Sequence, residues 1–422
     1  MRTVPVDDAH ALLARLPAAD SALAWVRDGE GMVGWGEALR LDTKGPDRFT
    51  EAVRWWHQVC QRLPVEDEVG LPGTGPVAFG SFAFADAPGE SVLVVPRTLV
   101  GRRAGAAWVT TVTSGDASLG DAPGSVEAHA PPEPPLGVRY AAGSQPVTAW
   151  HEAVAEAVRR MRATRSAAAG RPGPGEVDPA ALAKVVLAMD LLVTADEPLD
   201  PRFLLERLAE RYPGCWTFAV DGLVGATPEL LVRRLGSRVT SSVLAGTARR
   251  EYDPGGEAAV ADRLLHSSKD LAEHEYAVRS LADALAPFCA DLDVPQPRIL
   301  QLANVLHLAT DVTGHLTGDP GSMELAASVH PTAAVGGTPT DSALDVIDEL
   351  ERMDRGRYAG PVGWTDSRGD GEWAIALRCA QLDGSQARLF AGCGIVADSD
   401  PDAEVAEAQA KFVPMRDALE GS

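Results

Sequence analysis

The sequence has few cysteines, and their arrangement excludes two classes of protein. Cys60, Cys215, Cys289, Cys379 and Cys393 are odd in number and widely scattered, and no two of them form a CxxC pair. A disulfide framework or a zinc site would need regularly or closely spaced cysteines. We therefore expect buried thiols in a reducing compartment.

Long apolar runs are also lacking. No stretch approaches the roughly 20 apolar residues of a membrane-spanning helix. The first thirty residues contain five acidic residues and no continuous apolar segment of the kind that a signal peptide needs. We expect a cytoplasmic protein.

Basic residues are outnumbered by acidic ones, 38 to 60, which gives a formal net charge of −22. Such a field repels nucleic-acid phosphates and anionic membrane surfaces, so we expect neither as a partner. A small anion can still bind where a cation or local Lys and Arg side chains reverse the sign of the field.

The composition that is present is typical of a globular enzyme, with 45% hydrophobic and 23% charged residues in a chain of 422. Up to about Ala142, short segments rich in Val, Phe, Trp and Thr alternate with Gly, Pro and Asp, which predicts strands. From Val147 onward, predicted helices and strands intermix. We predict an α+β protein in which residues 1–142, a strand-rich half, and residues 147–422, the catalytic region, form one compact body.

Several predicted elements carry ionisable residues. Lys184 opens a β-branched run that reads as a buried strand, and Glu229 follows a proline at the mouth of another. LLHSSKDLAEHEYAVRSLADALAPF predicts one long helix, EWAIALRCAQLD predicts a strand, and Pro401 to Leu419 predicts an amphipathic helix.

Two pairs of carboxylates have the same helical spacing. Asp270 and Glu273 are three residues apart, as are Glu404 and Glu407, so each pair projects from one helix face. A hard divalent cation such as magnesium would neutralise them. Taken alone, each pair is better explained by a solvated acidic face, with Glu407 and Lys411 forming an ordinary i,i+4 ion pair.

Lys184 and Glu229 have similar alternatives. A buried lysine can lose its charge and take a proton from water, but a lysine at a strand end can also extend its amine to solvent. A glutamate in an apolar pocket can stay protonated and act as an acid, but a glutamate after a proline can also be a solvated loop residue.

Eight segments in order resemble the chorismate-utilising enzymes, and among these the isochorismate synthases in particular. The segments are KVVLAMD, GATPELLVRR, SSVLAGTARR, KDLAEHE, VHPTAAVGGTP, YAGPVGWTDSRGDGEWAIALRCA, RLFAGCGIV and EVAEAQAK. The resemblance covers Val147 to Leu419 strongly and the first half more loosely. It implies a two-lobed sandwich of two large antiparallel sheets flanked by helices, with the active site between the halves.

The resemblance also implies roles for individual residues. Glu273 and Glu407 would bind Mg²⁺, with Asp270 and Glu404 completing the acidic shell. Lys184 would be the general base that activates water for attack at ring C2 of chorismate, and Glu229 the general acid that protonates the departing C4 hydroxyl. The implied substrate-binding positions are Gly246, Thr247, His307, Ala334, Tyr358, Arg378, Gly392, Gly394 and Lys411.

The product implied first is isochorismate, since aminating relatives generally lack a lysine at position 184. Salicylate synthases, which continue to pyruvate elimination, are the main alternative. Ala334 stands where threonine is usual in members that eliminate or aminate. A catalytically silent chorismate-binding paralogue is a further alternative, but such a protein would be expected to lose Lys184, Glu229 or a metal ligand.

Two departures from the family pattern are Met189-Asp190, where an arginine is common, and Asp270, which is shorter than the usual glutamate. Neither removes a central group. We expect a monomer without an amidotransferase subunit. The residues leave open whether the product enters quinone (menaquinone) or siderophore biosynthesis.

Overall fold

The computed structural model describes residues 1–7, 10–17, 22–113, 127–169, 182–250, 254–301 and 305–421. Its strands are β1 (Arg2–Pro5), β2 (Leu23–Arg27), β3 (Glu30–Thr43), β4 (Glu66–Asp67), β5 (Val77–Ser81), β6 (Ser91–Arg103), β7 (Ala106–Thr111), β8 (Arg139–Ala142), β9 (Lys184–Thr194), β10 (Trp216–Val220), β11 (Leu223–Thr227), β12 (Leu230–Leu235), β13 (Arg238–Arg249), β14 (Cys289–Asp293), β15 (Arg298–Gln301), β16 (Val305–Leu316), β17 (Gly337–Thr338), β18 (Pro361–Asp366), β19 (Gly371–Ile375), β20 (Cys379–Asp383) and β21 (Gln386–Val396).

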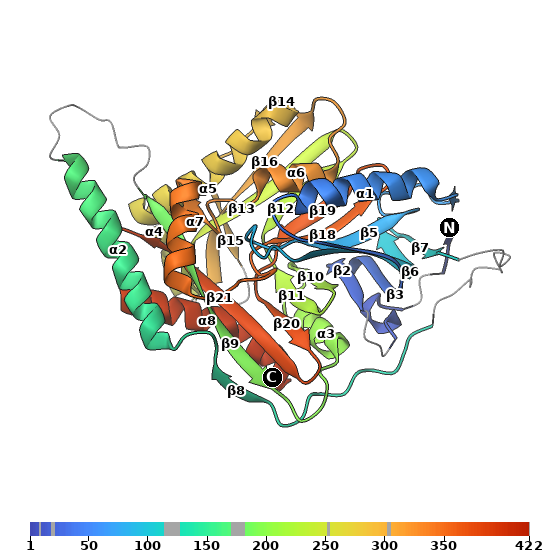
Figure 1. Ribbon diagram of the computed structural model, residues 1–422, viewed down its shortest axis with the longest axis horizontal. Helices are drawn as coiled ribbons and strands as arrows, with labels where there is room; N and C mark the ends of the chain where they lie inside the picture. Colours follow the sequence, from blue (N-terminus) through green and yellow to red (C-terminus); the bar gives the residue numbers. More distant parts are fainter. Residues whose placement is uncertain are drawn as a thin grey trace.

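The helices are α1 (Arg48–Arg62), α2 (Val147–Ala169), α3 (Pro201–Arg211), α4 (Pro254–His266), α5 (Ser268–Leu285), α6 (Ser322–Val329), α7 (Thr340–Glu351) and α8 (Pro401–Glu420), with short 3₁₀ turns η1 (Leu13–Arg15) and η2 (Ala286–Phe288). Figure 1 shows these helices around the outside of the strands. None of the helices in the described ranges is both long and apolar enough to span a membrane.

The strands form two antiparallel branches that diverge from β6. One branch continues through β3, β2, β10, β11, β20, β21 and β9. The other continues through β5, β18, β19, β12, β13 and β16. The predicted antiparallel fold with flanking helices is confirmed, and the two predicted sheets are two branches of one continuous sheet. N-terminal strands pair directly with C-terminal ones, β2 with β10 and β5 with β18; the predicted boundary at 142–147 stays a prediction.

A buried carboxylate joins the two branches. Glu372 of β19 accepts hydrogen bonds from the indole nitrogens of Trp25 on β2 and Trp216 on β10, each at 3.1 Å. Arg233 and Arg103 donate to it at 3.2 and 3.1 Å. Burial would raise the pKa of Glu372, but the two guanidinium groups and the hydrogen bond from Trp25 lower it below its ordinary value. The carboxylate is therefore charged, and it is hydrogen-bonded to both branches.

Three local predictions were wrong. The predicted single long helix is two helices. The Ser267 side chain accepts a hydrogen bond from the Asp270 N–H and so caps the start of α5, and α4 ends at His266. The strand EWAIALRCAQLD is two strands, since Arg378 has a φ of 48° and turns the chain between β19 and β20. Helix α1 was not predicted at all in the strand-rich half.

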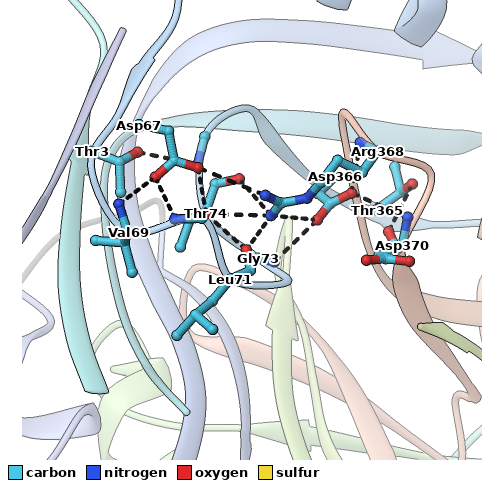
Figure 2. A network of polar contacts seen from close by, with 12 residues as sticks. Thr3, Asp67, Val69, Leu71, Gly73, Thr74, Thr365, Asp366, Arg368 and Asp370 are labelled. Atoms are coloured by element: carbon cyan, nitrogen blue, oxygen red, sulfur yellow. Dashed lines mark hydrogen bonds and ion pairs between the residues drawn. The ribbon is translucent and has the colours of Figure 1, made fainter. Parts of the chain in front are cut away.

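A polar network surrounds Asp366, the last residue of β18 in the second branch (Figure 2). The Asp366 carboxylate is fully buried. One of its oxygens accepts from the N–H groups of Arg368 and Asp370 at 2.8 and 3.1 Å, and the other from Gly73 N and the Arg368 guanidinium at 3.1 and 3.2 Å. The network therefore ties the loop before β5 to the turn between β18 and β19.

We expect Asp366→Asn to lower the free energy of unfolding by about 1–3 kcal/mol, because the amide nitrogen cannot accept the two hydrogen bonds that one oxygen now accepts. Urea unfolding measures the loss, and turnover should stay at the level of the unsubstituted protein. Asp383→Asn, at an exposed turn, is the matched control. Equal stability of the two variants would contradict this account of the network.

Candidate active site

A cavity of about 150 Å³ lies where the far ends of the two branches face each other. Its volume is similar to that of a cavity that accepts a benzene ring. Among the predicted site residues, all those whose side chains the structure describes line it: Lys184, Glu229, Gly246, Asp270, His307, Ala334, Tyr358, Arg378, Gly392, Gly394, Glu404, Glu407 and Lys411. The side chains of Thr247 and Glu273 lie outside the described part.

Two of these residues stand on connections between the branches. Glu229 follows Pro228 between β11 of the first branch and β12 of the second, and Arg378 lies between β19 of the second branch and β20 of the first. The chain therefore places both side chains where it crosses from one sheet branch to the other.

Lys184 is the first residue of β9 and is only 1% exposed. Its backbone pairs with Val396 of β21 on one side and with Thr338 of β17 on the other. The prediction that Lys184 opens a buried strand is confirmed. The alternative, in which the Lys184 amine extends to solvent, is inconsistent with this burial.

Glu229 is also buried, at 6% exposure. Burial raises its pKa to about 7, while the charge of Lys184 and a hydrogen bond from the Leu244 N–H oppose the rise. Glu229 is therefore largely protonated just below neutral pH. Loss of the positive charge on Lys184 would remove the largest opposing effect and favour protonated Glu229 further.

The carboxylates of α8 converge with Cys393. Ligand atoms of Glu404, Glu407 and Cys393 all lie within 4.8 Å of one another, and Glu404 is 4% exposed. Asp270, in the first turn of α5, lines the same cavity. The Cys393 thiol donates to the Glu404 carbonyl oxygen at 3.4 Å, which leaves carboxylate oxygens as the donor set. Oxygen donors of this kind fit a hard divalent cation.

Arg378 and His307 contact each other across the branches. The Arg378 guanidinium donates to His307 Nε2 at 3.1 Å. Burial and the charges of Arg378 and Lys411 hold the pKa of His307 well below its usual range, so the imidazole is neutral and its Nε2 accepts. Arg378 has a left-handed backbone conformation, which is uncommon outside glycine and typical of functional sites.

Lys411 donates to the Gly392 carbonyl oxygen and to the Glu407 carboxylate, both at 2.8 Å. Burial alone would lower the pKa of Lys411, but Glu407 raises it above its ordinary value, so the amine is charged. A side chain at Gly392 would contact the Leu187 carbonyl oxygen at 2.9 Å, so the close packing of β21 on β9 requires glycine there. Tyr358 stacks on Phe390, with ring centroids 5.0 Å apart.

Sequence reasoning missed several residues that line the cavity, notably Arg355 and the aromatic Phe390. Arg355 pairs with Glu351, four residues earlier, and both side chains are almost completely buried. The pair is not helical, because α7 ends at Glu351 and Arg352 is left-handed, so the spacing in ELERMDRG gave no usable signal. Their burial was not readable from the sequence.

Comparison with known proteins identifies relatives of the whole chain. A family model described as chorismate binding enzyme matches residues 6–420. Isochorismate synthase DhbC of Bacillus subtilis is 43% identical over 252 residues, 56% of this chain and 63% of that protein. Salicylate biosynthesis isochorismate synthase of Pseudomonas aeruginosa is 33% identical over 424 residues, 94% of this chain and 84% of that protein.

A solved structure has the same fold. That of MenF, the menaquinone-specific isochorismate synthase from Escherichia coli, aligns with a TM-score of 0.77 over 99% of this chain and 94% of that chain, at 24% identity. The family model over residues 6–420 and the Pseudomonas aeruginosa relative show that the chain belongs to the chorismate-binding enzyme family.

The raised pKa of Glu229 predicts a pH-dependent effect of Glu229→Gln on stability. Between about pH 4.5 and 7, the unfolded glutamate is ionised while the folded one keeps its proton. The native protein should therefore lose stability relative to the always neutral glutamine variant as pH rises through this window, and the difference should level off above about pH 7. Urea unfolding at a series of pH values measures it; a difference that is constant with pH would show that Glu229 ionises normally.

Proposed function

We propose that this protein is an isochorismate synthase, an isomerase that converts chorismate to isochorismate by attack of water at ring C2 and loss of the C4 hydroxyl. The observation that carries the proposal is the buried pair Lys184 and Glu229, an amine and a protonated carboxyl, lining one cavity of ring size. A hydroxyl transfer of this kind needs one group that accepts a proton from water and one that gives a proton to the leaving hydroxyl.

In the proposed mechanism, Lys184 accepts a proton from the water that attacks C2. Glu229 donates its proton to the C4 hydroxyl as the bond to C4 breaks, so that water leaves. Burial excludes other water and keeps Glu229 protonated.

The two carboxylates of chorismate would bind at separate places. Arg378 offers a planar, bidentate donor to the enolpyruvyl carboxylate, with Tyr358 close by. Lys411 contributes positive charge beside Gly392. Asp270, Glu273, Glu404 and Glu407 would hold Mg²⁺, which when bound would supply positive charge to the ring carboxylate. The acidic net charge of the chain thus need not exclude a dianionic substrate.

Release of isochorismate rather than salicylate is favoured by Ala334, a methyl side chain in the cavity wall where eliminating relatives usually carry threonine. The Pseudomonas aeruginosa relative named for salicylate biosynthesis is itself described as an isochorismate synthase. A monomer without an amidotransferase subunit and a cytoplasmic location stay predictions. Proteins described as menaquinone-specific and as 2,3-dihydroxybenzoate-specific isochorismate synthases both match the chain, so the pathway stays open.

Product analysis tests the proposed function. The purified protein is incubated with chorismate and Mg²⁺, and the products are separated by chromatography. Isochorismate should be the single product. Lys184→Ala should reduce kcat by about 10² to 10⁴-fold while chorismate affinity, measured by calorimetry, is retained, because the lysine acts on water. Salicylate with pyruvate would establish the alternative activity, and an aminated product in the presence of ammonia would overturn the role of water.

The role of the acidic cluster predicts a metal dependence. EDTA should abolish turnover, and Mg²⁺ should restore it. Mg²⁺ should also raise the thermal unfolding midpoint of the unsubstituted protein but not of Glu404→Gln, since a ligand that binds only the folded state stabilises it. Asp402→Asn, on the exposed side of the same helical turn, is the matched control. Full activity in EDTA would refute the metal site.

A further inference from the structure

We infer that the buried ion pair Glu351–Arg355 positions Lys184. The two side chains hydrogen-bond to the backbone of β9 where no neighbouring strand among the described residues pairs with it. The inference rests on the proposed function, because it assigns these residues a part in the reaction at Lys184. It concerns two side chains that are 1% and 3% exposed.

One edge of β9 is paired along its whole length, from Lys184 with Val396 to Thr194 with Gln386 of β21. The other edge is not. Among the described strands, β17 pairs there with Lys184 and Val185, and β8 pairs with residues 191–194. The stretch between these two short strands is buried, and its backbone groups need other partners.

Side chains supply most of those partners. Val186 N donates to the Gly336 carbonyl oxygen at 2.8 Å, and the Val186 carbonyl oxygen accepts from Arg355 Nη2 at 2.8 Å. Ala188 N donates to Glu351 Oε1 at 2.7 Å. The Ala188 carbonyl oxygen accepts from the Trp150 indole at 3.0 Å. Each backbone group of Val186 and Ala188 on this edge is therefore satisfied.

Arg355 also holds the adjacent segment of the cavity wall. Its Nη1 donates to the Val335 carbonyl oxygen at 2.9 Å, and its Nε to Glu351 at 2.9 Å. Its guanidinium lies over the Phe84 ring, 4.1 Å from the centroid. These contacts fix the distance between the strand that begins with Lys184 and the loop that carries Ala334. Only a guanidinium, with its several N–H donors in one plane, can reach the Val186, Val335 and Glu351 oxygens together.

The pair should act on kcat and not on substrate binding. A small displacement of a catalytic group can reduce a rate by about 10²-fold. Arg355→Lys keeps a charge for Glu351 but cannot donate to Val186, Val335 and Glu351 together. We expect kcat to fall by about 10 to 100-fold with KM within about threefold, and amide hydrogen exchange of the β9 peptide to become faster.

Arg234→Lys is the matched control. Arg234 is also a buried arginine, hydrogen-bonded to a backbone carbonyl oxygen and paired with Asp319, but it does not line the cavity. It should lose comparable stability with no change in kcat. All kinetics are measured where unfolding curves show each variant fully folded. If Arg355→Lys does not fold, Glu351→Gln replaces it, because the glutamine keeps an oxygen acceptor for the Ala188 N–H. We expect the same fall in kcat and a smaller increase in the amide hydrogen exchange of β9.

Unchanged kcat in a fully folded variant would overturn the inference. So would a rise in KM alone, which would make Arg355 a substrate-binding residue. If the unsubstituted protein makes no isochorismate, the proposed function fails, and the exchange rate of β9 in the variant decides whether the pair holds the strand.

Discussion

The buried carboxylate of Glu372 joins the two branches of the sheet, and the geometry of the site depends on that junction. The chain crosses between the branches at Glu229 and again at Arg378. A shift of one branch against the other would therefore move Glu229 and the Arg378 guanidinium relative to Lys184 on β9. Four donors from both branches hold Glu372, and this fixes the crossovers before any ligand binds.

The cavity gathers groups of both charges that are buried together, and their proton states follow from one another. Lys411 stays charged beside Glu407, His307 stays neutral beside Arg378, and Glu229 keeps its proton to about pH 7. Burial of charge is costly unless opposite partners are close. The acidic cluster on α5 and α8 therefore fits a cation, and the basic groups fit an anion, within one small volume.

Much of the fold and the site could be predicted because the signals were local. A β-branched run predicted β9, and residue spacing predicted the acidic pairs on α5 and α8. Local reasoning failed where a few residues changed the backbone, at Ser267 and at Arg378. It also failed for α1, whose Trp, Phe, Val and Thr residues favour strands in isolation, although Trp56 and Ala52 are buried on one helical face.

By itself the sequence determined the residue types, their order and the family they resemble, since motifs are read along the chain. Only the tertiary structure decided that Lys184 and Glu229 are buried, that Glu404 and Asp270 share a cavity, and that Glu351 and Arg355 complete the edge of β9. Burial and many of the hydrogen bonds depend on segments far apart in the sequence, such as Glu351 and Ala188, which are 163 residues apart. No local pattern encodes them, because they form only when the two sheet branches meet.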